Sequence, residues 1–242
     1  MEWHDDGIVL AARKHGESSA IVTLLTRHHG RHLGLVRGGA GRRKRGLFQP
    51  GNMVRATWRA RLAEHLGSFT CEMTEAVAAP LMDDRLRLAA LSAACAVADV
   101  ALPEREAHGP VYEGLGVLLG ALNQESWPSV YVKWELGLLQ ELGFGLDFSC
   151  CAATGTTENL TFVSPKTGRA VSEEAAAPFR KALLSLPPFL LETGRTGAAD
   201  DIFQGLKLTG FFLDRHVFVQ NRSGQAPNAR RRLLDLVRKL PS

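Results

Sequence analysis

The sequence predicts an α+β protein: a small five-stranded barrel of the OB-fold class, followed by an α-helical domain with a short β-ribbon inserted in it. Two observations lead to this prediction. The first 76 residues are short runs rich in Val, Ile, Leu, Thr and aromatic residues, separated by turn residues, as in strands. After Pro80, apolar residues recur instead at helical spacing. We therefore expect a barrel domain at residues 1–80 and a helical domain at residues 81–242.

Five strands are expected in the barrel, at residues 8–13, 20–26, 32–37, 53–61 and 68–76. Glycine, proline and polar residues between these runs provide the turns. Five short strands in about 75 residues fit a small closed barrel, and the OB-fold is a five-stranded barrel that binds oligonucleotides. The pattern alone does not exclude an SH3-like barrel.

Six helices are expected after the barrel, at residues 83–101, 110–122, 126–143, 172–185, 199–216 and 228–240. Asp83 and Ser126 are predicted to cap the first and third helices, because their side-chain oxygens can accept from free backbone N–H groups. Gly143 is expected to end the third helix. Between about residues 144 and 171 the helical spacing fails, and two short strands joined by turns predict a ribbon-like insert.

The composition is that of an ordinary globular protein. Of 242 residues, 45% are apolar and 22% are charged, which excludes disorder, collagen and coiled coil. No run approaches the ~18 apolar residues of a membrane span, and the acidic start is unlike a signal peptide, so we expect a cytoplasmic protein without membrane contact. Two of the four cysteines, Cys150 and Cys151, are neighbours, a poor geometry for a secreted disulfide framework.

Charge is unevenly distributed along the chain. Residues 1–65 hold 12 Lys and Arg against 5 Asp and Glu, a balance of +7. Residues 66–206 hold 9 against 18, or −9, and residues 207–242 hold 8 against 2, or +6. Because local fields and not the total charge act on a polyanion, the two basic ends are where a polyanion is expected to bind.

The loop at residues 38–46, Gly-Gly-Ala-Gly-Arg-Arg-Lys-Arg-Gly, is the strongest indication of nucleic-acid binding. Four cations between glycines predict a mobile arm that can follow a phosphate backbone, because arginine forks bind phosphates and counterion release supplies affinity. A solvated surface turn is the alternative. In the fourth strand, a period of two places Arg55, Arg59 and Arg61 on one face. Trp58 lies on the other face, which favours the core over a base-stacking platform.

These cations and their neighbours make the barrel basic. The candidate nucleic-acid-binding residues are Arg13, Lys14, Arg27, Arg31, Arg37, Arg42, Arg43, Lys44, Arg45, Arg55, Arg59 and Arg61. A second basic group is either an extension of the same path or a solvated helix face, and consists of Arg215, Arg222, Arg230, Arg231, Arg232, Arg238 and Lys239.

No metal site is expected. His28, His29 and His32 are close in sequence, but Arg27 and Arg31 beside them repel a cation. The cysteine pair at 150–151 and the threonine at 154 look like half of a zinc ribbon that has lost its second thiol. No cysteine follows to complete two C-x-x-C pairs, and the remaining two cysteines, at 71 and 95, are expected to be buried.

No enzyme activity, catalytic residue or cofactor is expected either. The sequence contains none of the motifs of nucleotide-binding loops, zinc proteases, nucleophile elbows or dinucleotide-binding turns. The paired carboxylates stand mostly at predicted helix starts, where they interact favourably with the helix dipole.

Several stretches, in order, resemble the RecO family of recombination mediators. Residues 16–26 (Gly-Glu-Ser-Ser-Ala-Ile-Val-Thr-Leu-Leu-Thr), Gly30-Arg31, the basic loop and residues 47–51 (Leu-Phe-Gln-Pro-Gly) are similar to the family's amino-terminal barrel. Residues 134–147 and 163–172 are similar to its helical domain and ribbon. The resemblance runs from about residue 5 to residue 235.

This resemblance implies an OB-fold followed by a helical domain with a zinc-ribbon-like insert. It also implies a role in DNA repair: binding single- and double-stranded DNA, annealing complementary strands and, with RecR, helping to load RecA onto DNA coated by single-strand-binding protein. Such a protein is nucleoid-associated. The chain departs from zinc-bearing members, because only Cys151 stands at the first thiol position and Thr154 at the second, so the insert is expected to lack the metal.

The family also contacts the acidic tail of single-strand-binding protein. An acidic peptide with an apolar end needs a cation beside an apolar groove, and the candidates for this contact are Tyr131, Lys133, Trp134 and Leu138. Burial of Trp134 in the helical core is the alternative. Two rival functions fit the same sequence: an OB-fold protein that binds RNA, and an adaptor whose acidic middle docks proteins and whose DNA affinity is incidental.

Overall fold

The computed structural model describes residues 1–192, 194–220 and 224–240, with Arg43 described by its backbone alone. The chain forms two compact units, one of Met1–Asn123 with Pro227–Leu233 and the other of Gln124–Ala226 with Leu234–Ser242. This division reflects packing, and the expected domain boundary near residue 80 stays a prediction. Within the described ranges, no helix is both long and apolar enough to cross a bilayer.

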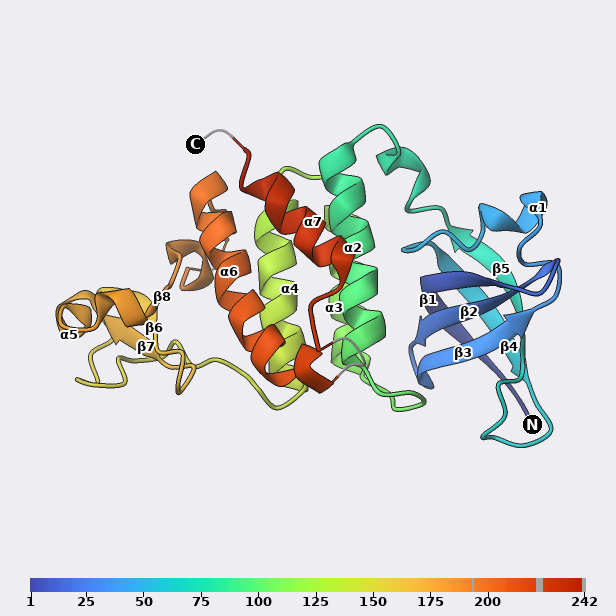
Figure 1. Ribbon diagram of the computed structural model, residues 1–242, viewed down its shortest axis with the longest axis horizontal. Coiled ribbons are helices and arrows are strands. Elements are labelled where there is room, and N and C mark those ends of the chain that lie inside the picture. Colours follow the sequence, from blue (N-terminus) through green and yellow to red (C-terminus); the bar gives the residue numbers. More distant parts are fainter. Residues whose placement is uncertain (193, 221–223, 241–242) are drawn as a thin grey trace. The chain divides into compact units, whose positions relative to one another are not determined.

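The amino-terminal part is a closed five-stranded barrel with the strand order β1-β2-β3-β5-β4 (Figure 1), which confirms the predicted OB-fold. The strands are β1 (Glu2–His15), β2 (Ser19–Thr26), β3 (Gly30–Val36), β4 (Met53–Arg59) and β5 (Ser68–Glu75). The first strand closes the barrel, because its first half pairs with β4 and its second half pairs with β2. A short parallel pairing joins Leu35 of β3 to Ser68 of β5.

The predicted start of the first strand, residue 8, is six residues too late. The polar start of the chain concealed the strand, since Glu2, His4 and Asp6 are exposed and face outward. Their cross-strand partners explain why they belong to the sheet: Glu2 lies opposite Arg59, and Asp6 lies opposite Arg55. The other four strands begin and end within two residues of the prediction.

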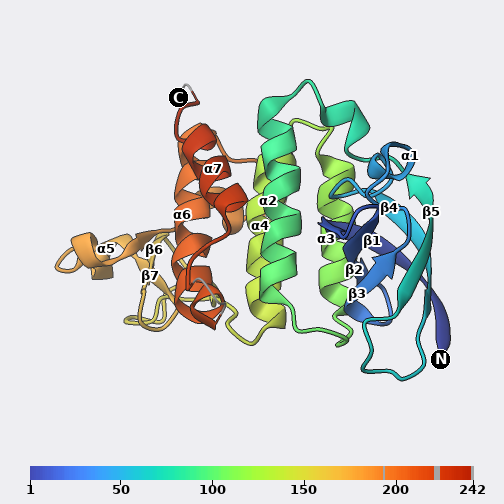
Figure 2. The ribbon, with the colours of Figure 1, turned by 45° about the vertical axis from the view of Figure 1, so that its right-hand side comes forward.

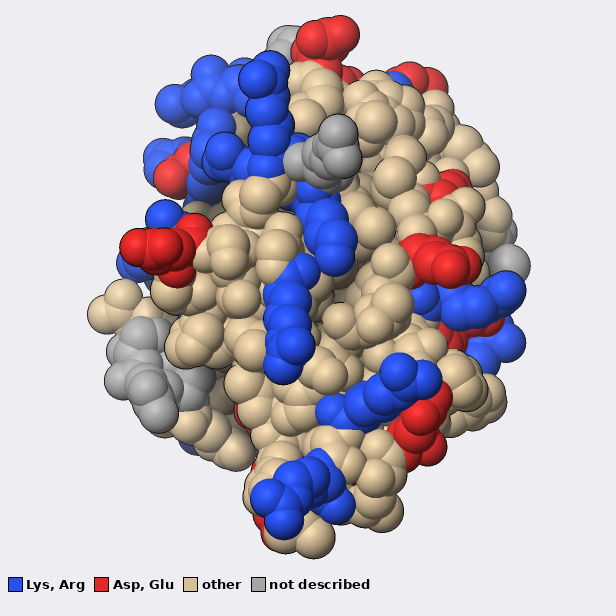
Figure 3. Space-filling model, turned by 90° about the vertical axis from the view of Figure 1, so that its right-hand side faces the viewer, with Lys and Arg blue, Asp and Glu red and all other residues tan. Residues whose placement is uncertain are grey.

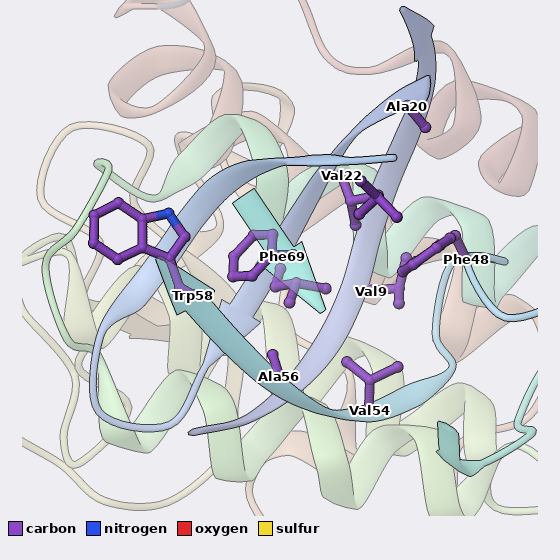
Figure 4. Close-up of a cluster of buried hydrophobic side chains, with 10 residues drawn as sticks. Val9, Ala20, Val22, Phe48, Val54, Ala56, Trp58 and Phe69 are labelled. Atoms are coloured by element: carbon purple, nitrogen blue, oxygen red, sulfur yellow. The ribbon is translucent and has the colours of Figure 1, made fainter. Parts of the chain in front are cut away.

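The barrel is filled by apolar side chains from all five strands and from the segment after the basic loop (Figure 4). Its largest members include Trp58, Phe69 and Phe48, and Trp58 is 2% exposed, as predicted for a core residue. Gly67 makes room for that indole, because a Cβ at this position, where φ is +64°, would lie 2.4 Å from the ring.

Two helices, α2 (Arg85–Ala101) and α3 (Gly109–Ala121), belong to the same unit as the barrel (Figure 2). A 3₁₀ turn at Ala79–Leu81 precedes α2, which packs against β1 and β2. The cap of α2 is Asp84, whose carboxylate accepts from the backbone N–H groups of Leu86 and Arg87, so the prediction of Asp83 is wrong by one residue.

The second unit contains α4 (Trp127–Glu141) and α6 (Ala199–His216), which pack together. The predicted bounds of α6 are confirmed. Thr209 on α6 donates to the buried carboxylate of Glu135 on α4. Ser126 is the N-cap residue of α4, as predicted, but its side chain makes no capping hydrogen bond. The ribbon-like insert is a three-stranded sheet, β7-β6-β8, of Leu160–Val163 (β6), Ala170–Ser172 (β7) and Leu184–Ser185 (β8).

The predicted helix at 172–185 is wrong. Only α5 (Glu173–Ala176) forms there, followed by a 3₁₀ turn at Arg180–Ala182 and then β8. Pro178 explains the break, because proline lacks the N–H of a helix interior and disfavours helical geometry in the residue before it. Further 3₁₀ turns lie at Pro188–Leu190 and Phe218–Gln220, and the last helix, α7 (Asn228–Val237), ends three residues early.

Candidate nucleic-acid interface

The basic loop is folded against the barrel. Within the loop that was predicted to be a mobile arm, residues Arg42–Arg45 form one helical turn, α1. The backbone N–H of Ala40 donates to the Ser18 carbonyl at 3.0 Å, and the Lys44 ammonium donates to the Arg37 carbonyl at 3.2 Å. After α1, Phe48 is 4% exposed in the barrel core. The turn is therefore anchored on both sides, and the backbone presents its cations from a defined place.

Two hollows flank α1, and both contain cations. One, of about 560 Å³, brings Arg13 and Lys14 at the end of β1 beside Arg45, with Glu17 also in its wall. The other, of about 320 Å³, is lined by Arg37 and Lys44 among residues of β3 and β5. In Figure 3, which faces the barrel, Lys and Arg side chains gather over part of the surface, with Asp and Glu mostly at its margins.

We call the exposed cations around α1 the α1 cations: Arg37, Arg42, Lys44 and Arg45, with Lys14 beside them. In the part of the chain that the structure describes, the ion pairs involve none of these five side chains. The side chain of Arg43 lies outside the described atoms. An exposed cation without a carboxylate partner is free to neutralise a phosphate.

The cations of β4 are in a different situation. Arg55 pairs with Asp6 at 3.4 Å, and Arg59 pairs with Glu2 at 2.8 Å, both across the β1–β4 ladder. The hydrogen bond from Arg59 lowers the pKa of the Glu2 carboxyl below its ordinary value. A phosphate at this face would compete with a carboxylate for each guanidinium. Arg61, which follows β4, is exposed.

Three further candidates contact the helices of their own unit. Arg31 is the most buried of them, with its side chain 17% exposed: its Nε donates to the carbonyl and carboxylate of Asp99, and its Nη1 lies 3.3 Å from Glu104. Arg27 pairs with Glu113 at 2.8 Å. Arg13 also reaches Asp99, at 3.8 Å, but is 82% exposed. Arg31 therefore fixes β3 to α2, a role that no sequence pattern indicated.

The candidates for the partner tail lie largely inside the helical unit. Tyr131, Trp134 and Leu138 are buried, as in the core alternative considered for Trp134. Lys133 is half-buried, with its Nζ 6.0 Å from the centre of the Phe189 ring. Binding of the partner tail at these residues stays a prediction. Among the four candidates, Lys133 is the one that is not buried, so the predicted contact depends on this side chain.

The basic residues near the carboxyl end are not alike. Arg215 donates to the Pro165 carbonyl at 2.9 Å, Arg230 is buried, and Arg231 bonds to Asn228. Arg222 lies outside the described residues. A continuous basic path along this segment stays a prediction.

The ribbon is held by hydrogen bonds to sulfur at the place of the expected first thiol. The Cys151 Sγ accepts from the Ser172 N–H at 3.3 Å and from its hydroxyl at 3.5 Å. Burial raises the pKa of the Cys151 thiol, but hydrogen bonds from Ser172 and Thr154 outweigh burial and lower the pKa to about 6. Among the described residues, no group of three or more His, Cys, Asp and Glu side chains converges as metal ligands would.

The chain is similar to known recombination and DNA repair proteins. Two family models match it: Recombination protein O N terminal over residues 1–77 and Recombination protein O C terminal over residues 82–225. DNA repair protein RecO of Rhodospirillum centenum is 56% identical over 242 residues, covering 99% of this chain and 96% of the relative. The proteins of the same name from Rhodospirillum rubrum and Cereibacter sphaeroides are 50% and 49% identical, with 97% and 99% of each relative covered.

Proposed function

The chain belongs to the recombination protein O (RecO) family of DNA repair proteins, and we propose that it binds single- and double-stranded DNA and anneals complementary strands. As its family implies, it then helps RecR to load RecA onto DNA coated by single-strand-binding protein, whose acidic tail it contacts. Such work is done in the cytoplasm, at the nucleoid.

The observation that carries the DNA-binding proposal is the group of unpaired α1 cations on an anchored turn beside two hollows. Annealing requires that phosphate repulsion between two strands is neutralised while the bases stay free to pair. Side-chain cations that contact phosphates and not the base edges supply that neutralisation, and released counterions supply the affinity. The mechanism is binding, without a bond being made or broken.

The test is a salt-dependent titration with single-stranded DNA, run beside an annealing assay. Replacing Arg42, Arg43, Lys44 and Arg45 by Ala should weaken affinity for all sequences alike and flatten the salt slope by up to about four phosphate contacts. Unchanged affinity and slope would contradict the proposal.

A matched pair of variants separates position from total charge. Lys44→Ala/Arg45→Ala and Arg55→Ala/Arg59→Ala each remove two cations from the barrel, but the second pair already has carboxylate partners. The α1 pair should lose more affinity and more annealing rate. Competition with RNA of the same length tests the rival RNA-binding function, which requires RNA to compete as well as DNA.

A further inference from the structure

Three aromatic rings form a parallel stack that begins in the barrel core and ends at the surface. Trp58 is buried, Trp3 is half-buried, and the His29 side chain is 36% exposed. The Trp58 and Trp3 centroids are 5.7 Å apart with 17° between the planes, and those of Trp3 and His29 are 4.0 Å apart with 6°. Because Trp3 covers one face of the imidazole, a further ring can join the stack only at the opposite face of His29.

The outer ring of this stack is held in its orientation. The buried Asp5 carboxylate accepts from the His29 ring Nδ1 at 2.8 Å and from the backbone N–H groups of His28 and His29 at 2.8 and 3.2 Å. The inner ring is also fixed, since the Trp58 indole N–H donates to the Leu66 carbonyl at 3.0 Å. A ligand ring that joins the stack therefore meets side chains that are already ordered.

The surroundings of the stack fit a nucleic-acid strand. The backbone of Met1 pairs with that of Ala60, so the connection between β4 and β5 starts two residues from Trp3. In OB-folds this connection flanks the ligand. Here Arg105 holds this connection, donating to the Glu64 and His65 carbonyls at 3.0 Å, and the exposed Arg61 is the second residue of the connection.

We propose that an unpaired DNA base stacks on the face of His29 opposite Trp3 and so extends this ladder of stacked rings by one. This inference rests on the proposed DNA-binding function and adds a base contact to it. Stacking on an aromatic face tolerates any sequence, because every base has a π-face. Bases inside a duplex already have their faces covered, so the ladder favours single strands over duplex DNA, a distinction that the α1 cations alone do not make.

Two substitutions of His29 separate stacking from structure. His29→Asn removes the ring but keeps an amide N–H in the position of Nδ1, where it can still donate to Asp5. His29→Phe keeps a ring for stacking and loses that hydrogen bond. His28→Ala is the matched control, because the His28 side chain is an exposed neighbour outside the ladder.

The experiment compares binding of oligo-dT with binding of an abasic strand of the same length, which offers phosphates without bases. The parent protein should prefer oligo-dT; His29→Asn should lose about five- to tenfold in oligo-dT affinity with the abasic strand unchanged. His29→Phe and His28→Ala should retain the preference. Duplex affinity should be the same in all four proteins.

Three results would overturn the proposal: a parent that binds both strands equally, a folded His29→Asn protein with the parent's preference, or a His29→Phe protein that loses the preference as His29→Asn does. Circular dichroism of each variant establishes that it is folded. Binding of neither strand by the parent would refute the DNA-binding function itself, and binding of both strands with equal affinity would refute only the ladder.

Discussion

The barrel carries two groups of cations that look alike in the sequence and differ in the structure. Arg55 and Arg59 on β4 lie opposite the carboxylates of Asp6 and Glu2, whereas the α1 cations have no acidic partner among the described residues. The difference comes from strand register, which places residues about 50 positions apart opposite each other. A count of basic residues thus overstates a binding surface unless the partners of each residue are known.

The largest effect is expected from a cation that is used inside the fold. Arg31→Ala should lower the free energy of unfolding by about 3 kcal/mol, because it leaves the Asp99 and Glu104 carboxylates without their shared partner. Arg55→Ala, at an exposed pair, should leave the denaturation midpoint almost unchanged. Urea unfolding of both variants checks this. Equal destabilisation would contradict the prediction that the Arg31 ion pairs stabilise the fold more than the Arg55 ion pair does.

Two histidines that contact Trp3, His29 and His32, also differ in whether they have a charged partner. His29 has Asp5 as a partner, whereas His32 is 4% exposed among Trp3, Trp58 and Phe69. Burial, with the nearby charges of Arg105 and His29, lowers the pKa of His32 to about 4.

The free energy of unfolding of the barrel should therefore decrease as the pH is lowered. Between about pH 6.5 and pH 4 the unfolded chain binds a proton at His32 that the folded protein resists, so the free energy of unfolding decreases by up to about 3 kcal/mol as the pH drops through this window. His32→Phe removes the titrating group. The difference in stability between the parent and this variant should change across that window and be constant above pH 7; a constant difference throughout contradicts the assignment.

A smaller effect is expected from freeing the paired cations. Glu2→Gln/Asp6→Asn removes the charge of both partners while keeping polar groups of similar size opposite Arg59 and Arg55. If these ion pairs are what keeps the β4 arginines from binding phosphates, DNA affinity should rise about two- to fivefold. The salt slope should also steepen by up to about two phosphate contacts. Glu75→Gln, on exposed β5, controls for the general change in charge. Unchanged DNA binding would place the β4 face outside the DNA path.

The fold was largely predictable because it depends on local pattern. Alternation and turn residues located four strands closely, and helical spacing located α6 to the residue. The errors have local causes: acidic residues conceal the start of β1, and Pro178 interrupts an otherwise helical pattern. Asp83 and Asp84 are adjacent carboxylates, and only the backbone geometry shows which one caps α2.

The site was less predictable, because its features depend on contacts between distant residues. Arg31 and Asp99 are 68 positions apart, and the stack of Trp3 on His29 joins the first strand to the turn between β2 and β3. The sequence did hold a signal for the inner half of the stack, because a first strand that begins at residue 2 pairs Trp3 with Trp58 across the β1–β4 ladder. It held no signal for the contact between Trp3 and His29.

The smallest effect is expected in the helical unit, where Lys133 is the one cation among the proposed tail contacts. Lys133→Glu reverses its charge without emptying a core position, and should lower affinity for the acidic terminal peptide of single-strand-binding protein about twofold. Lys207→Glu is a matched control, since Lys207 lies over the Phe203 ring at 5.6 Å much as Lys133 lies near Phe189 at 6.0 Å. Both variants lose a similar cation–π contact, so a loss specific to Lys133→Glu reports binding and not packing. Peptide titration by fluorescence anisotropy, with binding of bare DNA measured in parallel, checks this. Equal affinities of the two folded variants would place the tail contact elsewhere on the protein.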